Sequence, residues 1–141
     1  MEYPSDIYDT SVVEFSVLLN KTLSKIDVFR DFAKEGDLIA FTVNDGDVYY
    51  MTHQQEDSEK VYLCDMIGSF DDLVDTPILQ AEKSTNSTPR VSRYTVDDLN
   101  MWTFYKLATL KGYMPLCWRG TSNGYYSVGV SFLKLEKEND E

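Results

Sequence analysis

Residues 38–51 read LIAFTVNDGDVYYM, and this stretch decides the predicted fold class. Two runs rich in β-branched and aromatic residues, 38–43 and 48–51, lie on either side of the pair Asp45-Gly46. A tight hairpin turn needs a positive φ, and glycine adopts that conformation without a clash at Cβ. The stretch therefore predicts a β-hairpin.

Three further β-rich runs lie toward the C-terminus, at residues 102–110, 113–119 and 125–135. Short segments that contain glycine separate them, and one of these segments ends in an Asn-Gly pair, which suits a turn. Strands joined by short connections usually pair with their neighbours in sequence. Two hairpins in series predict a three-stranded antiparallel meander over residues 102–135.

Helical signals are few. Ser69 can cap a short helix over residues 69–74, Asp72 complements the helix dipole, and Pro77 prevents continuation. A second helical turn is expected near residues 12–22, although this segment also fits a bent strand. With the hairpin and the meander, these signals predict an α+β fold that is mainly antiparallel β-sheet with one or two short helices.

A chain of 141 residues corresponds to one domain. We expect a single globular domain over residues 11–135, preceded by a flexible acidic arm at 1–10 and followed by an acidic tail at 136–141. A short strand is expected at 78–82. Residues 83–93 are rich in Ser, Thr, Asn and Pro, which predicts a flexible loop.

The chain holds 24 acidic and 13 basic residues, for a formal net charge of −11. Affinity for a nucleic-acid backbone comes from Lys and Arg, so this composition argues against direct general nucleic-acid binding. Aromatic residues make up 13% of the chain, which is too many for a disordered acidic tail. No apolar run approaches the ~20 residues of a membrane helix, so no membrane association is expected.

The N-terminus reads MEYPSD and lacks the basic and apolar regions of a signal peptide. Two cysteines, Cys64 and Cys117, lie among apolar residues. Without a secretory signal such cysteines are expected to be reduced and buried, and a disulfide or a redox role is the alternative. These features predict a cytoplasmic location.

Charge is distributed unevenly along the chain. Residues 101–135 contain four basic residues and no acidic residue, and they hold eight of the 19 aromatic residues. Strand alternation divides their side chains between a face that is largely core and a face that carries Tyr, Ser, Thr and basic residues. The second face is either a solvated part of the sheet or a site for a nucleotide-type ligand or an aromatic side chain. The candidate ligand-binding residues are Arg119, Tyr105, Asn123, Tyr125 and Lys106.

The acidic remainder of the chain has a functional interpretation of its own. A dense negative surface can imitate the phosphates of nucleic acid and occupy a basic groove on a partner protein. The candidate partner-binding residues are Asp57, Glu59, Asp71 and Asp72. The alternative is an ordinary solvated surface, and Asp71 and Asp72 also suit the start of a helix.

Signals for catalysis are weak. His53 is the single histidine, so a site with several histidines cannot form. A nucleophilic pair of Cys64 and His53 lacks any known nucleophile motif, and residues 120–124 lack the lysine of a phosphate-binding loop. The sequence therefore predicts no catalytic residue, no metal and no cofactor, while a role for His53 stays open.

Longer strings of residues match a known family. They include WTFYKLAT at residues 102–109 and SNGYYS at residues 122–127, with shorter matches upstream in the same order. Across residues 38–132 the chain resembles an uncharacterised family of small proteins encoded in phage and prophage genomes, a domain of unknown function. The resemblance implies a phage context, in which small accessory proteins often inhibit host machinery, and it implies no established activity.

The chain departs from this family at one motif. Where the family reads His-x-Gln-Asp-Cys-Cys-Glu, residues 53–59 read His-Gln-Gln-Glu-Asp-Ser-Glu. Asp57 and Ser58 stand in the positions of the two cysteines. A metal or redox role that depends on those cysteines could not operate in this chain.

Three hypotheses follow. The first is a non-enzymatic phage-type accessory protein that binds and inhibits a host protein, such as an anti-phage defence protein, through its acidic surface. The alternative is a module that binds or sequesters a nucleotide-type small ligand on the basic aromatic meander. A hydrolase built on acidic residues or His53 is the least favoured. Exposed sheet edges also allow a homodimer.

Overall fold

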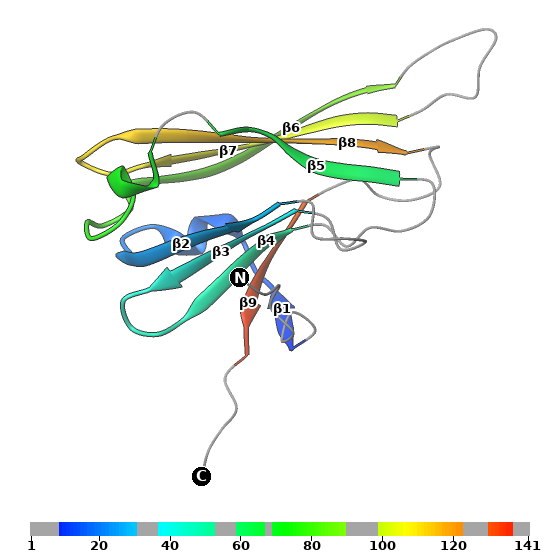
Figure 1. Ribbon diagram of the computed structural model, residues 1–141. Helices are drawn as coiled ribbons and strands as arrows, with labels where there is room; N and C mark the ends of the chain where they lie inside the picture. The colour runs from blue at the N-terminus through cyan, green and yellow to red at the C-terminus, as the bar shows by residue number, and fades with distance from the viewer. Residues whose placement is uncertain are drawn as a thin grey trace, which may run out of the picture.

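Two antiparallel β-sheets pack against one another in the structure, which is a computed structural model (Figure 1). It describes residues 9–30, 37–52, 59–66, 69–89, 99–122 and 130–136. The strand order of the five-stranded sheet is β1 (Thr10–Val12), β9 (Ser131–Leu135), β4 (Val48–Thr52), β3 (Leu38–Val43) and β2 (Leu23–Phe29). The strand order of the four-stranded sheet is β5 (Glu59–Met66), β8 (Tyr113–Ser122), β7 (Leu99–Ala108) and β6 (Gln80–Pro89).

The main hydrophobic core fills the space between the two sheets. Ile39, Phe41 and Val43 alternate along β3 and are almost fully buried in this core, as the two-residue period of a strand requires. Trp118 on β8 is buried opposite them, and its indole N–H donates a hydrogen bond to Sδ of Met51 at 3.1 Å. Since Met51 lies on β4, this contact joins the two sheets inside the core.

The opposite face of the five-stranded sheet carries a second, smaller cluster. Leu38, Ala40 and Tyr50 are buried in it, together with partly buried hydrophobic neighbours: Phe29, Val48, Leu133 and Leu135. Both faces of β3 are therefore apolar. This explains why its sequence is a nearly continuous hydrophobic run instead of an alternating one.

The hairpin expected at residues 38–51 is confirmed by the pairing of β3 with β4. Gly46 has a φ of 100°, the conformation for which glycine was expected. The Val43 N–H donates to the Asp47 carbonyl at 2.8 Å, and the Asp47 N–H donates to Oδ1 of Asp45 at 2.9 Å. The turn is thus held by both the backbone and the Asp45 side chain.

The expected three-stranded meander is wrong at its third strand. β7 and β8 form the predicted hairpin, but β9 joins the other sheet, between β4 and β1, and β5 occupies the place beside β8. The hairpin rule considers only neighbours in sequence, whereas β9 carries Phe132, which completes the core face of the other sheet. Residues 123–129 lie outside the described residues.

The loop expected at residues 83–93 is also wrong in its first part. Residues 83–89 continue β6, which pairs with β7 as far as Pro89 opposite Leu99. An edge strand tolerates polar residues, and threonine favours extended structure, so this composition did not exclude a strand. Residues 90–93 lie outside the described residues.

The structure describes residues 9 and 10 of the expected arm and residue 136 of the expected tail. Thr10 belongs to β1, so the arm ends earlier than residue 10. The N–H of Glu136 donates to the carbonyl of Asp9 at 2.9 Å, which continues the pairing of β1 with β9 by one step. Residues 1–8 and 137–141 lie outside the described residues.

Helical structure in the described ranges is limited to two single 3-10 turns, η1 (Phe15–Leu18) and η3 (Phe70–Asp72). Ser69 caps η3 as expected, because its Oγ accepts the N–H of Asp71 at 3.2 Å. Since the described residues otherwise form strands, turns and irregular segments, the fold is a β-rich antiparallel fold, and the α+β prediction is wrong in its helical part. Neither turn has the length or the apolar character of a membrane-crossing helix.

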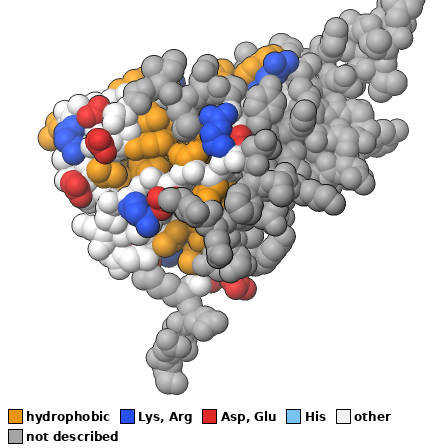
Figure 2. Space-filling view, viewed as in Figure 1, with side chains coloured by type: hydrophobic (Ala, Val, Ile, Leu, Met, Phe, Trp, Pro, Cys, Tyr) orange, Lys and Arg blue, Asp and Glu red, His pale blue; other side chains and the backbone are white. Residues whose placement is uncertain are grey.

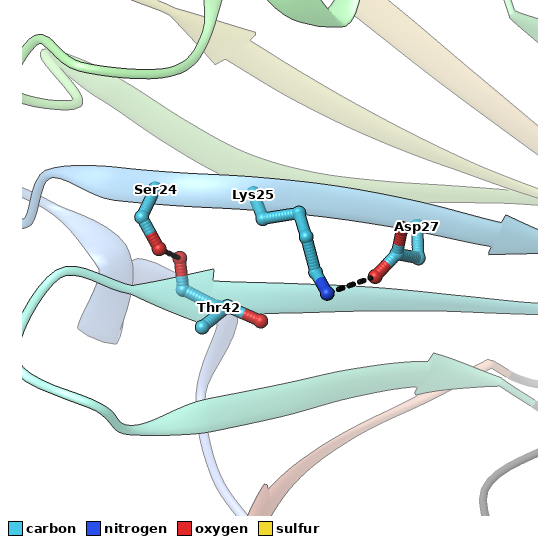
Figure 3. Close-up of polar contacts among 4 residues, drawn as sticks. All are labelled: Ser24, Lys25, Asp27 and Thr42. Carbon is cyan, nitrogen blue, oxygen red and sulfur yellow. Dashed lines mark hydrogen bonds and ion pairs between the residues drawn. The ribbon is translucent and has the colours of Figure 1, made fainter.

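β2 forms one edge of the five-stranded sheet and carries features that discourage pairing with another chain. A register shift between Leu23 and Lys25 leaves Ser24 as a bulge, and its Oγ donates to the Thr42 carbonyl at 3.3 Å (Figure 3). Lys25 and Asp27 form an ion pair at 3.2 Å along the same strand. An exposed pair of this kind adds little stability, but charges and bulges protect an edge strand.

Two side chains that flank strands of the five-stranded sheet, Arg30 after β2 and Asp37 before β3, bond to the edge of the other sheet at Leu63 of β5. The buried carboxylate of Asp37, just before β3, accepts the Leu63 N–H on Oδ2 at 2.8 Å. Nη2 of Arg30 donates to the Leu63 carbonyl at 2.8 Å. Both backbone groups of Leu63 therefore have side-chain partners in place of a further strand.

Figure 2 shows one side of the molecule, on which hydrophobic side chains reach the surface in a band with charged side chains on either side. Partial burial of core-lining residues on the edge strand β2, namely Ile26 and Val28, agrees with this view. The core is thus not completely covered along β2.

Candidate binding surface

The outward face of the four-stranded sheet is the strongest candidate for a binding surface. Thr103, Tyr105 and Leu107 of β7 point into the core and are at most 1% exposed. The residues between them therefore point away from the core. The same alternation on β8 buries Leu116 and Trp118. We give the name outer sheet face to six of these outward residues: Trp102, Phe104, Lys106, Tyr113, Cys117 and Arg119.

The outer sheet face is aromatic and partly exposed. Phe104 is 37% exposed and Tyr113 is 49% exposed. Strand register places Arg119 directly opposite Trp102, and the guanidinium carbon lies 5.5 Å from the centre of a Trp102 ring. Cys117 lies opposite Phe104 and is partly exposed. A cation–π pair and an exposed phenyl ring therefore lie side by side on two neighbouring strands.

Two cations on this face have no carboxylate partner among the described residues. Neither Lys106 nor Arg119 forms an ion pair there, and the buried Nε of Arg119 has no hydrogen-bond partner in that part of the chain. Glu82 lies opposite Lys106 on β6, but its carboxylate accepts a hydrogen bond from the Gln80 amide at 2.9 Å. The outer sheet face thus combines exposed aromatic rings with available positive charge.

Tyr105, an expected ligand-binding residue, lies on the other side of the sheet. It is fully buried, and its hydroxyl donates to the Val130 carbonyl at 3.5 Å. Nζ of Lys83 donates to the same carbonyl at 3.1 Å and lies 5.8 Å from the centre of the Tyr105 ring. Tyr105 therefore holds the start of β9 against the four-stranded sheet and is separated from Lys106 and Arg119.

Burial raises the pKa of Tyr105 above its ordinary value of 10.0, since the core disfavours a phenolate. Burial and the nearby carboxylates of Asp47 and Asp45 also raise the pKa of Tyr49. The unfolded chain then releases these protons first as the pH rises. The contribution of these two protonated tyrosines to the free energy of unfolding is therefore complete below about pH 10, and it is lost as the pH rises above that value.

We expect the free energy of unfolding to fall between about pH 9 and pH 11, with Tyr105 contributing on the order of 1 kcal/mol of the decrease. The variant Tyr105→Phe cannot ionise, so its stability should decline less steeply over this range. Urea denaturation at several pH values measures the difference. Leu110→Ala, which alters an exposed side chain without a titratable group, should follow the wild-type profile, and equal slopes for all three proteins would contradict the expectation.

The structure brings only part of the expected acidic surface together. Asp71 is exposed on η3, and Asp72 is half-buried beside it. The Asp72 carbonyl accepts the hydroxyl of Thr109, and its side chain lies so close to Gly112 that a Cβ there would approach Oδ2 to 2.8 Å. Asp72 thus fastens η3 to the β7–β8 turn, and Asp71 is the residue free to face a partner.

Other expected residues are not placed with this face. Asp57, Asn123, Tyr125 and His53 lie outside the described residues, as do the side chains of Glu59 and Cys64, although both of these residues belong to β5. In the described part of the chain, no group of three or more His, Cys, Asp or Glu residues could hold a metal ion.

The sequence interpretation missed Trp102 and Phe104 as site residues. Both share the parity of Lys106 along β7, so alternation could have placed them on one face with it. The obstacle was that β7 carries large apolar residues on both faces, which leaves the sequence without a contrast between an inner and an outer side. The packing of the second sheet makes that choice.

The fold and this surface define a β-sandwich with an exposed basic aromatic sheet face. The chain belongs to the family described as domain of unknown function DUF7448, whose model matches residues 16–132. A search of the curated proteins finds no match, and a search of the solved structures finds none either. The family membership confirms the expectation of a domain of unknown function and assigns no activity.

Proposed function

We propose that this protein is a non-enzymatic binding module that binds a partner protein through its outer sheet face. The observation that carries the proposal is the Arg119–Trp102 pair beside the exposed ring of Phe104. Trp, Tyr and Arg are the residue types that dominate binding energy at protein interfaces. The resemblance to phage-encoded proteins makes a host protein, such as an anti-phage defence protein, the first class of partner to examine.

This proposal moves the binding surface from the acidic residues to the outer sheet face. Asp71 is exposed, but Asp72 is engaged with the β7–β8 turn. By contrast, covering an exposed aromatic sheet face with a partner contributes a favourable free energy of roughly 25 cal/mol per Å² of apolar area that is removed from water. We assign the acidic surface a secondary role, in which its long-range charge attracts basic regions of the partner that lie outside this contact.

A nucleotide-type small ligand is the second candidate, favoured by the presence of Arg119, Lys106 and exposed rings on one face. Three of its five expected contacts are unsupported by the described geometry, because Tyr105 lies in the core and both Asn123 and Tyr125 are outside the described residues. Small-molecule sites are usually concave and enclose most of their ligand. An open sheet face suits a protein partner better.

Affinity capture from host-cell lysate, followed by mass spectrometry, tests the proposal with a matched set of variants. The wild type and Leu110→Ala, which trims an 84% exposed side chain at the β7–β8 turn, should capture the same partner. The double variant Phe104→Ala, Arg119→Ala should lose it. Circular dichroism and thermal melting verify that all three proteins are folded.

Capture that survives the double variant would contradict the proposal. Thermal-shift measurements with mononucleotides on the same three proteins distinguish the second candidate. A rise in melting temperature that Arg119→Ala abolishes would favour the small ligand, and unchanged melting curves would count against it.

A further inference from the structure

We infer that the outer sheet face recognises an extended acidic segment of a partner protein, with carboxylates at positions i and i+4 and an apolar side chain at i+2. This inference rests on the proposed function and specifies the chemistry of its partner. It comes from the order of groups along β7, where Trp102 with its paired Arg119 is followed by Phe104 and then by Lys106.

The spacing of these groups matches that of an extended chain. Trp102 and Lys106 are four residues apart, which corresponds to roughly 13 Å along a strand, with Phe104 midway between them. Side chains at i, i+2 and i+4 of an extended segment share one face and have the same spacing. Such a segment, lying along β7, would place one carboxylate near Arg119, an apolar side chain on Phe104 and a second carboxylate near Lys106.

Charge complementarity selects carboxylates at both ends. Lys106 and Arg119 lack an ion-pair partner among the described residues. Arginine binds a carboxylate through two parallel hydrogen bonds, and these charge-assisted bonds are roughly twice as strong as neutral ones. The stacking of Arg119 on Trp102 holds its guanidinium in place for this contact.

The net charge of the chain limits the partner to few anionic groups. At −11, the protein repels a long polyanion such as a nucleic-acid strand. Glu82, which lies opposite Lys106 on β6, adds local repulsion against further negative charge. A protein segment with two well-placed carboxylates satisfies both cations with little additional repulsion.

Synthetic peptides test the spacing directly. The first is a blocked seven-residue peptide with Asp at positions 2 and 6 and Leu at position 4, in a background of Ser and Ala. The second has the same composition, with Asp at positions 3 and 5. Fluorescence anisotropy of labelled peptides measures binding, and the first should bind at least about tenfold more tightly than the second.

Charge reversal provides an independent arm. Lys106→Glu should weaken binding of the first peptide at least about tenfold, and a peptide with Lys in place of one Asp should restore it. A short oligothymidylate tests the alternative class of partner, a single-stranded nucleic acid. Equal binding of the two isomers, absence of binding up to about 1 mM, or stronger binding of the oligothymidylate would overturn the inference.

The outcomes separate this inference from the proposed function. If partner capture depends on Phe104 and Arg119 but the peptide isomers bind equally, the outer sheet face is an interface and the acidic-segment specificity is wrong. If capture does not depend on these residues, both proposals fail.

Discussion

Replacing Phe132 with alanine should lower the free energy of unfolding by about 3–5 kcal/mol, the range for a buried phenylalanine. The ring is 3% exposed and lies between three other rings, with centroid distances of 5.1 Å to Phe15, 5.9 Å to Phe41 and 5.4 Å to Tyr49. The substitution leaves a cavity bordered by all three. For a chain of this length, we expect the melting temperature to fall by roughly 10 °C.

Urea denaturation followed by tryptophan fluorescence measures this effect, because Trp118 lies in the same core. Phe132→Leu keeps most of the volume and should cost no more than about 1.5 kcal/mol. Tyr113→Ala removes a half-exposed ring and should change stability by about 0.5 kcal/mol or less. If Phe132→Ala costs no more than Tyr113→Ala, then β9 does not occupy the place that the structure gives it.

Phe132 also illustrates what the sequence alone could not decide. Its strand was expected from the β-rich run at 125–135, and β9 does form there. The sheet predicted for this strand was wrong, because a hairpin rule pairs each strand with its neighbour in sequence. The choice of sheet depends on which core lacks a large side chain, and that depends on the packing of strands far apart in the chain.

Local signals, by contrast, predicted the parts of the fold that are set locally. The Asp45-Gly46 turn and the cap at Ser69 both appear as expected, since each depends on a few adjacent residues. The strand at 83–89 was missed for the opposite reason. Its Ser and Thr residues give no local preference against a loop, and pairing with β7 holds them extended.

The candidate site also combines residues that the sequence singled out with residues whose position depends on the packing of the two sheets. Arg119 and Lys106 were selected from charge, and the structure places both on the outer sheet face. Tyr105 was selected by composition, and alternation could not show that its side of β7 faces the other sheet. Trp102 and Phe104 were overlooked because an aromatic residue on a strand is usually core. Their exposure follows from Tyr105 and Leu107 filling the core instead.

Replacing Asp37 with alanine is the change that we expect to loosen the two sheets from each other, at a cost of about 2–3 kcal/mol. The carboxylate is buried and accepts the Leu63 N–H at 2.8 Å, so its removal leaves a backbone donor on β5 without that acceptor. The neighbouring hydrogen bond from Arg30 to the Leu63 carbonyl does not replace it, because it serves the other backbone group.

The variant Asp37→Asn keeps a carbonyl oxygen at the same place, so it should recover most of the lost stability and cost only about 1 kcal/mol. Hydrogen exchange locates the effect: the amide of Leu63 should lose protection in Asp37→Ala, while the amides shared by β7 and β8 should keep theirs relative to global unfolding. Uniform loss of protection across both sheets would show that Asp37 stabilises the fold as a whole and does not act at the β5 edge. Equal stability of wild type and Asp37→Ala would exclude the contact as a link between the sheets.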